Sequence, residues 1–420
     1  MLGVLGEVTG PDDPCLALRL AAGERYAAWL DELGEAGGAP PPLGRGTFVV
    51  ASTRHAGDVT ALDAIEDAAI GTGLGSERLD PADVSGLAPA TGYEPARVLS
   101  LPDEGFVDAR SLRAAVVDAA RGVSVQVRAG RVARLLLTGE RVVGVELEDK
   151  QRIMCGHVVL CVGAVAGPLL RASGLPLDMV PITLRAKGVG VVLEPAARRA
   201  PPTDYVLRTP NRAFACGLHL VPVENRAVYT GATNRVSRLD GVLGGAAAGE
   251  VAQVLTTAAA ELHHQLATWH ISSVRYGVRA LTLDGVPVAG ETLTDGLLVA
   301  GGAYRNGVLL APLLADSIGS SLDNGTPDPR LTPHRMPPAA DVDALLVAGR
   351  EQLAEMLRDP LDDVAAAWVN GLLVALDRVL EDPSADAAVR LRSLLERYPR
   401  IEMVPEALVE ALEDSPSGAD

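Results

Sequence analysis

Aromatic residues are scarce in this sequence, and their scarcity says what its core is made of. Phenylalanine, tyrosine and tryptophan make up 3% of the 420 residues, whereas hydrophobic residues make up 48%. Such a core consists mainly of alanine, valine and leucine, which suits helices packed on a buried sheet. Because 420 residues exceed what one core usually serves, we expect two closely connected domains plus an appendage.

Cysteine and metal-binding patterns are also sparse. The four cysteines, Cys15, Cys155, Cys161 and Cys216, have no paired CxxC spacing. We therefore expect buried free thiols rather than disulfides or a zinc site. The histidines of ELHHQLATWH at 261–270 lack the HExxH pattern, which favours a helix surface over a metal site.

The chain has fewer positively than negatively charged residues. The chain has 37 lysines and arginines against 54 acidic residues, a net charge of −17. Nucleic acid or an anionic membrane would require a basic face, so neither is expected as a partner. No apolar run reaches the roughly 18 residues of a membrane span, and no signal-peptide pattern opens the chain. These features predict a cytoplasmic protein.

The hydrophobic periodicity predicts alternating helices and strands up to residue 330. The run 158–162 is apolar throughout, which is typical of a central strand in a parallel sheet. A mostly antiparallel sheet is expected between 180 and 278. GTGLG at 71–75 follows a helix and is interpreted as a helix stop. The predicted helices are 16–33, 58–70, 110–120, 246–266, 308–322 and several within 335–412; the predicted strands are 47–51, 123–127, 132–138, 142–148, 158–162 and 297–300.

The segment VAGGAYRNGVLLAP at 299–312 contains the first candidate for a binding site. A buried strand ends at Gly301 and Gly302, and a helix begins near Gly307. Such a turn presents free backbone N–H groups at the carboxyl end of a sheet, and a helix start carries partial positive charge. Ligand binding and a plain structural turn are both compatible with this pattern.

Arg279 forms the second candidate, together with Arg305. Arg279 falls at the end of a predicted strand, just before the Asp-Gly turn at 284–285. Two arginines separated by a hairpin can point into one cleft, where the planar guanidinium matches a carboxylate in bidentate fashion. The alternative is that each arginine pairs with one of the many acidic side chains.

Two motifs carry a resemblance to a known family. GVRALTLDGVPVAG at 277–290, followed by GLLVAGGAYRNGVLLAP at 296–312, resembles the closing signature of the FAD-dependent amino acid oxidases, which include glycine oxidase, D-amino acid oxidase and sarcosine oxidase. DEGFVD at 103–108, HVVLCVGA at 157–164 and the pair LVP and YTGAT at 220–233 extend the resemblance over roughly residues 1–330.

The resemblance implies a fold and a division into parts. The fold would be an α/β dinucleotide-binding sheet with an incomplete first βαβ unit, an antiparallel substrate sheet and a helical C-terminal extension. The flavin part would comprise about 1–45, 106–175 and 279–330. The substrate part would comprise about 46–105 and 176–278, and the extension about 335–412.

The resemblance also assigns roles to residues. It implies that Arg279 grips the substrate carboxylate, that Arg305 assists, and that His219 replaces a pocket tyrosine. The cofactor would be FAD, held by residues from several segments: Val132, Gly163, Ala164, Gly302, Arg305, Asn306, Gly307, Val308 and Leu309. The implied reaction oxidises a small amino acid or secondary amine to an imine, which hydrolyses to an oxo acid, while oxygen or another acceptor takes the electrons.

The chain departs from the family at its start. The strand-GxGxxG-helix unit that anchors the pyrophosphate is missing, and Met1 to Val4 resemble the segment that follows it. A start assigned too late, a partner chain carrying the nucleotide unit, and a chain without flavin remain alternatives. The rival function is therefore a non-catalytic or half-site subunit, and the C-terminal helices are a candidate docking surface. If the chain starts at Met1, an open groove is expected beside 159–163.

Overall fold

The computed structural model describes residues 1–8, 10–11, 13–175, 182–195, 203–212, 215–223, 226–238, 245–282, 285–323 and 325–334, and all structural statements below concern these residues. The predicted C-terminal helices within 335–412 lie outside the described residues. In the described part, no helix is both long and apolar enough to cross a membrane.

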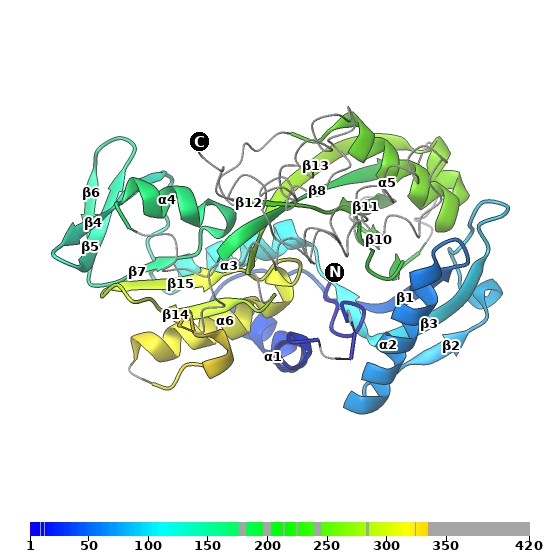
Figure 1. Ribbon diagram of the computed structural model, residues 1–420, viewed down its shortest axis with the longest axis horizontal. Coiled ribbons are helices and arrows are strands. Elements are labelled where there is room, and N and C mark those ends of the chain that lie inside the picture. The colour runs from blue at the N-terminus through cyan, green and yellow to red at the C-terminus, as the bar shows by residue number, and fades with distance from the viewer. Residues whose placement is uncertain are drawn as a thin grey trace, which may run out of the picture.

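A nine-stranded sheet forms the largest element of the structure (Figure 1). Its order is β12-β8-β11-β10-β9-β1-β3-β2, and β13 pairs with the other edge of β8. Only the pairing of β1 with β9 is parallel, which confirms the predicted antiparallel character. The strands are β1 (Gly44–Ser52), β2 (Glu77–Leu79), β3 (Pro95–Phe106), β8 (Ile182–Glu194), β9 (Val206–Arg208), β10 (Ala215–Pro222), β11 (Val228–Thr233), β12 (Arg235–Arg238) and β13 (His270–Thr282).

One face of this sheet is apolar and is covered by helix α5 (Ala248–Glu261). Leu207, Leu218 and Leu220 point to this face and pack with Val254 and Ala258 of the helix. Their sequence neighbours Arg208 and His219 therefore belong to the opposite face, because side chains alternate along a strand. Burial of the leucines fixes the register of the strands and thereby sets which polar residues lie on the other face.

Two smaller sheets complete the strand structure. The first, in the order β14-β15-β7, contains one parallel pair, β15 with β7, and β7 is its last strand in the described part of the chain. The second is the antiparallel meander β4-β5-β6. Their strands are β14 (Val288–Glu291), β15 (Leu297–Gly301), β7 (Val158–Leu160), β4 (Val132–Thr138), β5 (Arg141–Leu147) and β6 (Arg152–Met154).

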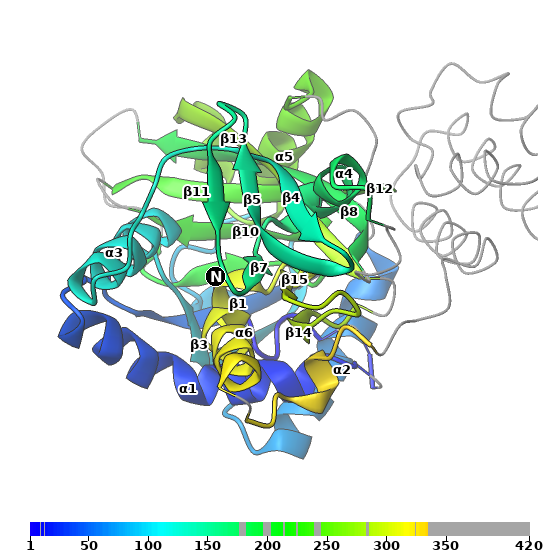
Figure 2. The same ribbon diagram turned by 90° about the vertical axis from the view of Figure 1, so that its left-hand side faces the viewer.

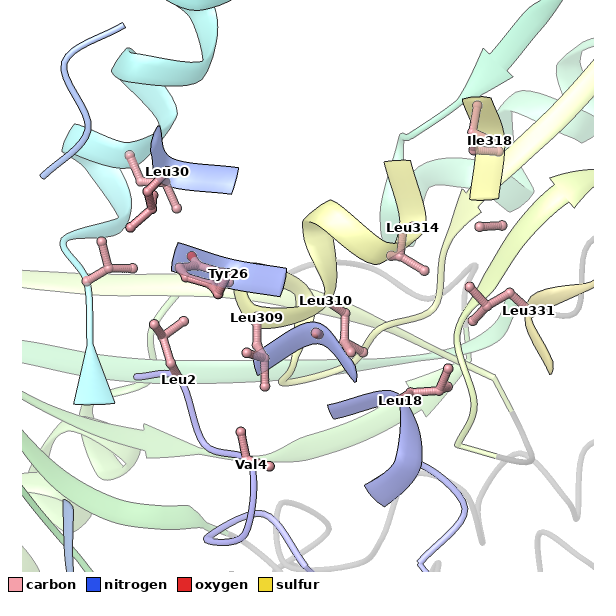
Figure 3. Packing of buried hydrophobic residues seen from close by; sticks show 14 of the residues in the cluster. Leu2, Val4, Leu18, Tyr26, Leu30, Leu309, Leu310, Leu314, Ile318 and Leu331 are labelled. Atoms are coloured by element: carbon pink, nitrogen blue, oxygen red, sulfur yellow. The ribbon is translucent and has the colours of Figure 1, made fainter. Parts of the chain in front are cut away.

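Helices α1 (Leu16–Glu35) and α6 (Gly307–Leu322) lie side by side next to the small sheet β14-β15-β7 (Figures 1 and 2). Leu309 and Leu310 of α6 pack with Tyr26 of α1 and with Leu2 and Val4 (Figure 3). This cluster holds the start of α6 firmly against the first residues of the chain. The other helices are α2 (Ala56–Thr72), α3 (Ala109–Gly122) and α4 (Ala166–Ala172), with short 3₁₀ turns that include Gly163–Val165 and His264–Thr268.

Several local expectations are corrected. Residues 123–127 form no strand: Val123, Val125 and Val127 are exposed after the end of α3. The apolar run at 158–162 is shorter than predicted and lies at the end of its described sheet rather than at its centre. The predicted helix over 246–266 ends at Glu261, and a separate 3₁₀ turn follows at His264–Thr268.

The expectation of buried thiols holds for one cysteine. Cys15 is buried, whereas Cys155 and Cys161 are exposed; all three are free thiols. Cys161 is exposed because it lies just beyond the end of β7. The interpretation of GTGLG is confirmed: α2 ends at Thr72, and Gly73 caps it in the left-handed conformation with φ 73°.

Candidate functional site

The glycine turns predicted to approach a ligand lie at one edge of the small sheet. Leu297 pairs with Val158 and Val299 with Leu160 in parallel, so both strands end at the same edge. The chain beyond β7 then reaches Gly163, and the chain beyond β15 reaches Gly302. Carboxyl ends of parallel strands are where open α/β sheets bind ligands.

The turn after β15 is tied to the end of β13. Gly302 and Tyr304 have φ of 71° and 46°, so the backbone here is left-handed at two residues. The Tyr304 N–H donates to the Ala280 carbonyl at 3.0 Å, and Leu281 forms a bridge with Ala303. Arg279 precedes this hydrogen bond and Arg305 follows it. The structure therefore brings the backbones of the two predicted arginines together.

The start of α6 offers backbone donors. Asn306 is its N-cap residue, but its side chain makes no capping hydrogen bond. The first-turn N–H groups of an α-helix have no intrahelical acceptor, so those of Gly307, Val308 and Leu309 can face a ligand. Gly307 is exposed, and a Cβ built there would come no closer than 3.9 Å to another residue. The Leu309 side chain is buried, so only its backbone can take part.

The residues predicted near the adenine half of a dinucleotide lie after the end of β7 and at the start of β4. Val132 and Ala164 are partly buried and pack against one apolar cluster around β7 and β15. Gly163 has φ 54°, and a Cβ there would meet nothing within 4 Å. A small, open, partly apolar surface with free N–H groups nearby fits the ring systems and polar edges of FAD.

Arg279 lies on the polar face of the large sheet without an acidic partner. Its Nη1 donates to the Thr233 carbonyl at 3.3 Å, and the residue is partly buried. In the described part of the chain, no carboxylate is within ion-pair distance of this guanidinium. Its positive charge is therefore uncompensated, which is the condition for binding an external carboxylate.

Arg305 is placed differently, because it forms an ion pair with Glu7. The Arg305 Nε lies 3.2 Å from Glu7 Oε2, and the two side chains are 13% and 4% exposed. Its guanidinium carbon is also 4.9 Å from the centre of the Tyr304 ring. The alternative considered from the sequence, pairing with an acidic residue, thus describes Arg305, whereas Arg279 fits the carboxylate receptor.

Glu7 joins Arg305 to a second arginine. Arg208 Nη1 donates to Glu7 Oε1 at 2.8 Å, and Arg208 is fully buried. Asn211 connects the two: its Oδ1 accepts from Arg208 Nη2 at 2.8 Å, and its Nδ2 donates to Glu7 Oε2 at 3.3 Å. Burial alone would raise the pKa of Glu7, but Arg305 and Arg208 outweigh it and lower that pKa to about 2.

Two further titratable groups adjoin this network. Burial raises the pKa of Glu104, whose Oε1 accepts from the Leu5 and Gly6 N–H groups and whose Oε2 has no hydrogen-bond partner. Burial and the neighbouring Arg208 lower the pKa of His219 to about 3. The ring is therefore neutral near pH 7, and its Nδ1 lies 2.8 Å from the Gly217 carbonyl, to which it donates.

His219 is separated from Arg279 within the sheet. His219 pairs with Arg208 and Gly231, and Gly231 pairs with Gly190, which in turn pairs with Arg275 rather than Arg279. Three strand spacings lie between β10 and β13, or about 14 Å. His219 therefore belongs to the Arg208 and Glu7 end of the face.

Sequence reasoning missed Glu7, Arg208 and Glu104. Glu7 and Arg208 are 201 positions apart, so no local pattern connects them. One signal was available: Arg208 directly follows the apolar residues Val206 and Leu207 in a strand, where a buried arginine requires a partner.

The glycine turns at the strand ends of the small sheet and the basic side chains on one face of the large sheet fit the α/β class of flavoproteins. The chain belongs to the FAD-dependent oxidoreductase family, whose model matches residues 6–320. This confirms the family, the fold class and the FAD cofactor expected from the sequence. The division into parts and the individual site residues stay predictions.

Related proteins share segments of the chain. A glycine oxidase of Pseudomonas aeruginosa is 33% identical over 186 residues, 43% of this chain and 46% of that protein. A bifunctional protein ThiO/ThiG of Nostoc sp. is 30% identical over 255 residues, 60% of this chain and 36% of that protein. The chain thus matches less than half the length of these curated relatives.

Solved structures share the fold. Glycine oxidase from Geobacillus kaustophilus superposes with a TM-score of 0.64 at 24% identity, over 77% of this chain and 83% of that one. Iminodiacetate oxidase from Chelativorans sp. BNC1 gives the same TM-score at 19% identity, over 78% and 86%. Proteins acting on different amines thus share this fold, and the substrate has to be argued from the site.

Proposed function

We propose that the protein oxidises a small amino acid or a secondary amine that carries a carboxylate, with FAD as the electron acceptor. The observation that carries the proposal is that Arg279 is partly buried and has no acidic partner among the described residues. An arginine in that state binds a carboxylate more strongly than a paired one, since no internal ion pair has to be broken.

The backbone next to Arg279 supports this location for the substrate site. The hydrogen bond from Tyr304 to Ala280 places the end of β13 beside the turn that leads into α6. The backbone from Gly302 to Leu309 would border the flavin ring, and the partial positive charge at the helix start would favour a ring that gains electron density. Gly163, Ala164 and Val132 would hold the adenine-ribose half.

Each group of the chain has a limited task in this reaction. Bound FAD would supply the acceptor for a hydride from the α-carbon of the substrate. Arg279 orients that carbon by holding the carboxylate, and the apolar cluster under α6 excludes water from the turn. Arg305 is held in place by Glu7 in the turn that leads into α6. His219 is neutral and holds no proton to donate from Nε2 near pH 7.

The overall change balances without a protein acid or base. The substrate loses two electrons and two protons to become an imine, and oxygen gains them as peroxide. Water hydrolyses the imine to an oxo acid, with release of ammonia from an amino acid or of an amine from a secondary amine. Relatives named glycine oxidase make glycine the first substrate to test.

The test compares substrates that differ only by the carboxylate. FAD-loaded protein is mixed without oxygen with glycine or methylamine, and with sarcosine or dimethylamine. We expect the flavin absorbance to bleach with glycine or sarcosine and to stay unchanged with the amines that lack the carboxylate. Equal bleaching by methylamine and glycine would contradict a carboxylate-dependent site, and no bleaching by any amino acid would contradict the function.

A further inference from the structure

Four glycines form a bare patch on the polar face of the large sheet. Gly277 of β13 lies opposite Gly188 of β8, and Gly190 of β8 lies opposite Gly231 of β11. Cross-strand partners share a face, as do alternate residues of one strand. All four positions therefore leave the same face without side chains. We call Gly188, Gly190, Gly231 and Gly277 the glycine floor.

The side chain of Arg279 lies across one member of the glycine floor. A Cβ built at Gly188 would stand 2.6 Å from the guanidinium carbon of Arg279, and both terminal nitrogens would be closer still. Real Cβ atoms do not approach other atoms so closely, so Arg279 could not keep this position beside an alanine. Gly188 thus leaves the space that the guanidinium occupies.

The opposite glycine provides a built-in comparison. A Cβ at Gly277 would meet nothing within 4 Å, although Gly277 is the direct cross-strand partner of Gly188. Neither residue has a positive φ, so an alanine fits the backbone at both positions. The two positions therefore share strand pairing and face, and differ in whether Arg279 covers them.

Tyr229 covers the floor at the other end. A Cβ at Gly190 would stand 2.5 Å from Cζ of the Tyr229 ring. Arg275, opposite Gly190, has its guanidinium carbon 5.9 Å from the centre of that ring. Arg279 and Tyr229 thus both lie close to the sheet where a glycine permits it: Gly188 sets the height of Arg279 above the strands, and Gly190 sets that of Tyr229.

We propose that Gly188 is a positioning residue for Arg279: by lacking a side chain, it lets the guanidinium lie on the sheet and fixes where the substrate carboxylate binds. The inference rests on the proposed function of Arg279. A carboxylate bound at this height stays close to the sheet, and the α-carbon attached to it is held at one distance from the strand ends.

The test uses the FAD-loaded full chain with Gly188→Ala and the matched variant Gly277→Ala. For Gly188→Ala we expect the KM for glycine or sarcosine to rise at least about tenfold, with kcat within about twofold, because carboxylate binding is weakened in ground and transition state alike. Gly277→Ala should leave both constants within about twofold of the wild type. Acetate affinity, measured calorimetrically, should follow KM without requiring turnover.

A third variant separates a displaced arginine from general damage. If Gly188→Ala acts through Arg279, adding it to Arg279→Met should change KM and acetate affinity by less than about twofold, since the affected group is already gone. Equal effects of the two alanines, or a full additional loss in the double variant, would overturn the inference. The wild type oxidises glycine or sarcosine in either case, so this result is distinct from failure of the proposed function.

Discussion

The two faces of the large sheet are built from the same strands but are stabilised by different interactions. On one face, Leu207, Leu218 and Leu220 pack under α5. On the other, their direct sequence neighbours Arg208 and His219 adjoin Glu7 in a buried polar network. The apolar face is stabilised by burial and tolerates any side chain of suitable volume. The polar face requires particular partners, because an unpaired buried charge is costly.

This difference explains how the arginines divide their tasks. Arg208 and Arg305 share the carboxylate of Glu7, whereas Arg279 is held by a backbone carbonyl. Glu7 thus supplies negative charge to Arg208 and Arg305, which lie in distant segments of the chain. The uncompensated arginine is the one available to a ligand. The experiments below test this difference between the paired arginines and Arg279, starting with the largest expected effect.

Replacing Glu7 should damage stability more than replacing its neighbour Glu104. Glu7→Gln removes the buried carboxylate that Arg208 and Arg305 share, and we expect it to lower the free energy of unfolding by about 3–5 kcal/mol. Glu104→Gln keeps an oxygen for the Leu5 and Gly6 N–H groups, and burial already raises the pKa of Glu104. Its cost should stay near about 1 kcal/mol.

Urea unfolding at neutral pH measures both variants, with Glu7→Asp as a check that charge, rather than side-chain length, matters most. Glu7→Asp should recover part of the lost stability. If the two glutamine variants are equally stable, Glu7 does not hold the two arginines as described.

Replacing His219 should change how stability depends on pH. Its pKa is lowered to about 3 in the folded protein, so below its usual value near 6.5 only the unfolded state binds the proton. This contribution to stability is complete above pH 6.5 and is lost as the pH falls toward 3. Between pH 7 and pH 5 it amounts to about 2 kcal/mol. His219→Gln should remove about that much of the pH dependence.

Leu220→Ala, one residue along on the opposite face, is the matched control. It should lower stability by about 2–5 kcal/mol at both pH values, because it removes packing and no titrating group. Unfolding in urea at pH 7 and pH 5 distinguishes the two. An unchanged pH dependence in His219→Gln would show that the buried ring is not the group that resists protonation.

Local sequence patterns were enough to locate the turn at Gly302, the start of α6 and the strand that carries Arg279. Each depends on a few adjacent residues: glycine before a helix, or alternation along one strand. The prediction of a strand at 123–127 was wrong, because it too relied on only a few adjacent residues. Its valines alternate, but alternation shows only a preferred face, and Ser124 adopts a φ of 66° just after α3 ends.

The charge network could not be derived in this way. Glu7, Arg208 and Arg305 lie in three distant segments, and their meeting depends on the pairing of β9 with β1 and on the packing of α6 against the first residues. The role of Gly188 was equally hidden, since a glycine in a strand gives no indication of which side chain lies over it.

Binding of a simple carboxylate to single-arginine variants tests the central claim most directly. Acetate is titrated calorimetrically into the FAD-loaded wild type, Arg279→Met and Arg305→Met. Since Arg279 is uncompensated and Arg305 is paired with Glu7, we predict an affinity loss of about 100-fold for Arg279→Met, the equivalent of about 2.7 kcal/mol. For Arg305→Met, the loss should be below about tenfold. An Arg279→Met protein that binds acetate as tightly as the wild type, or a larger loss in Arg305→Met, would contradict the account.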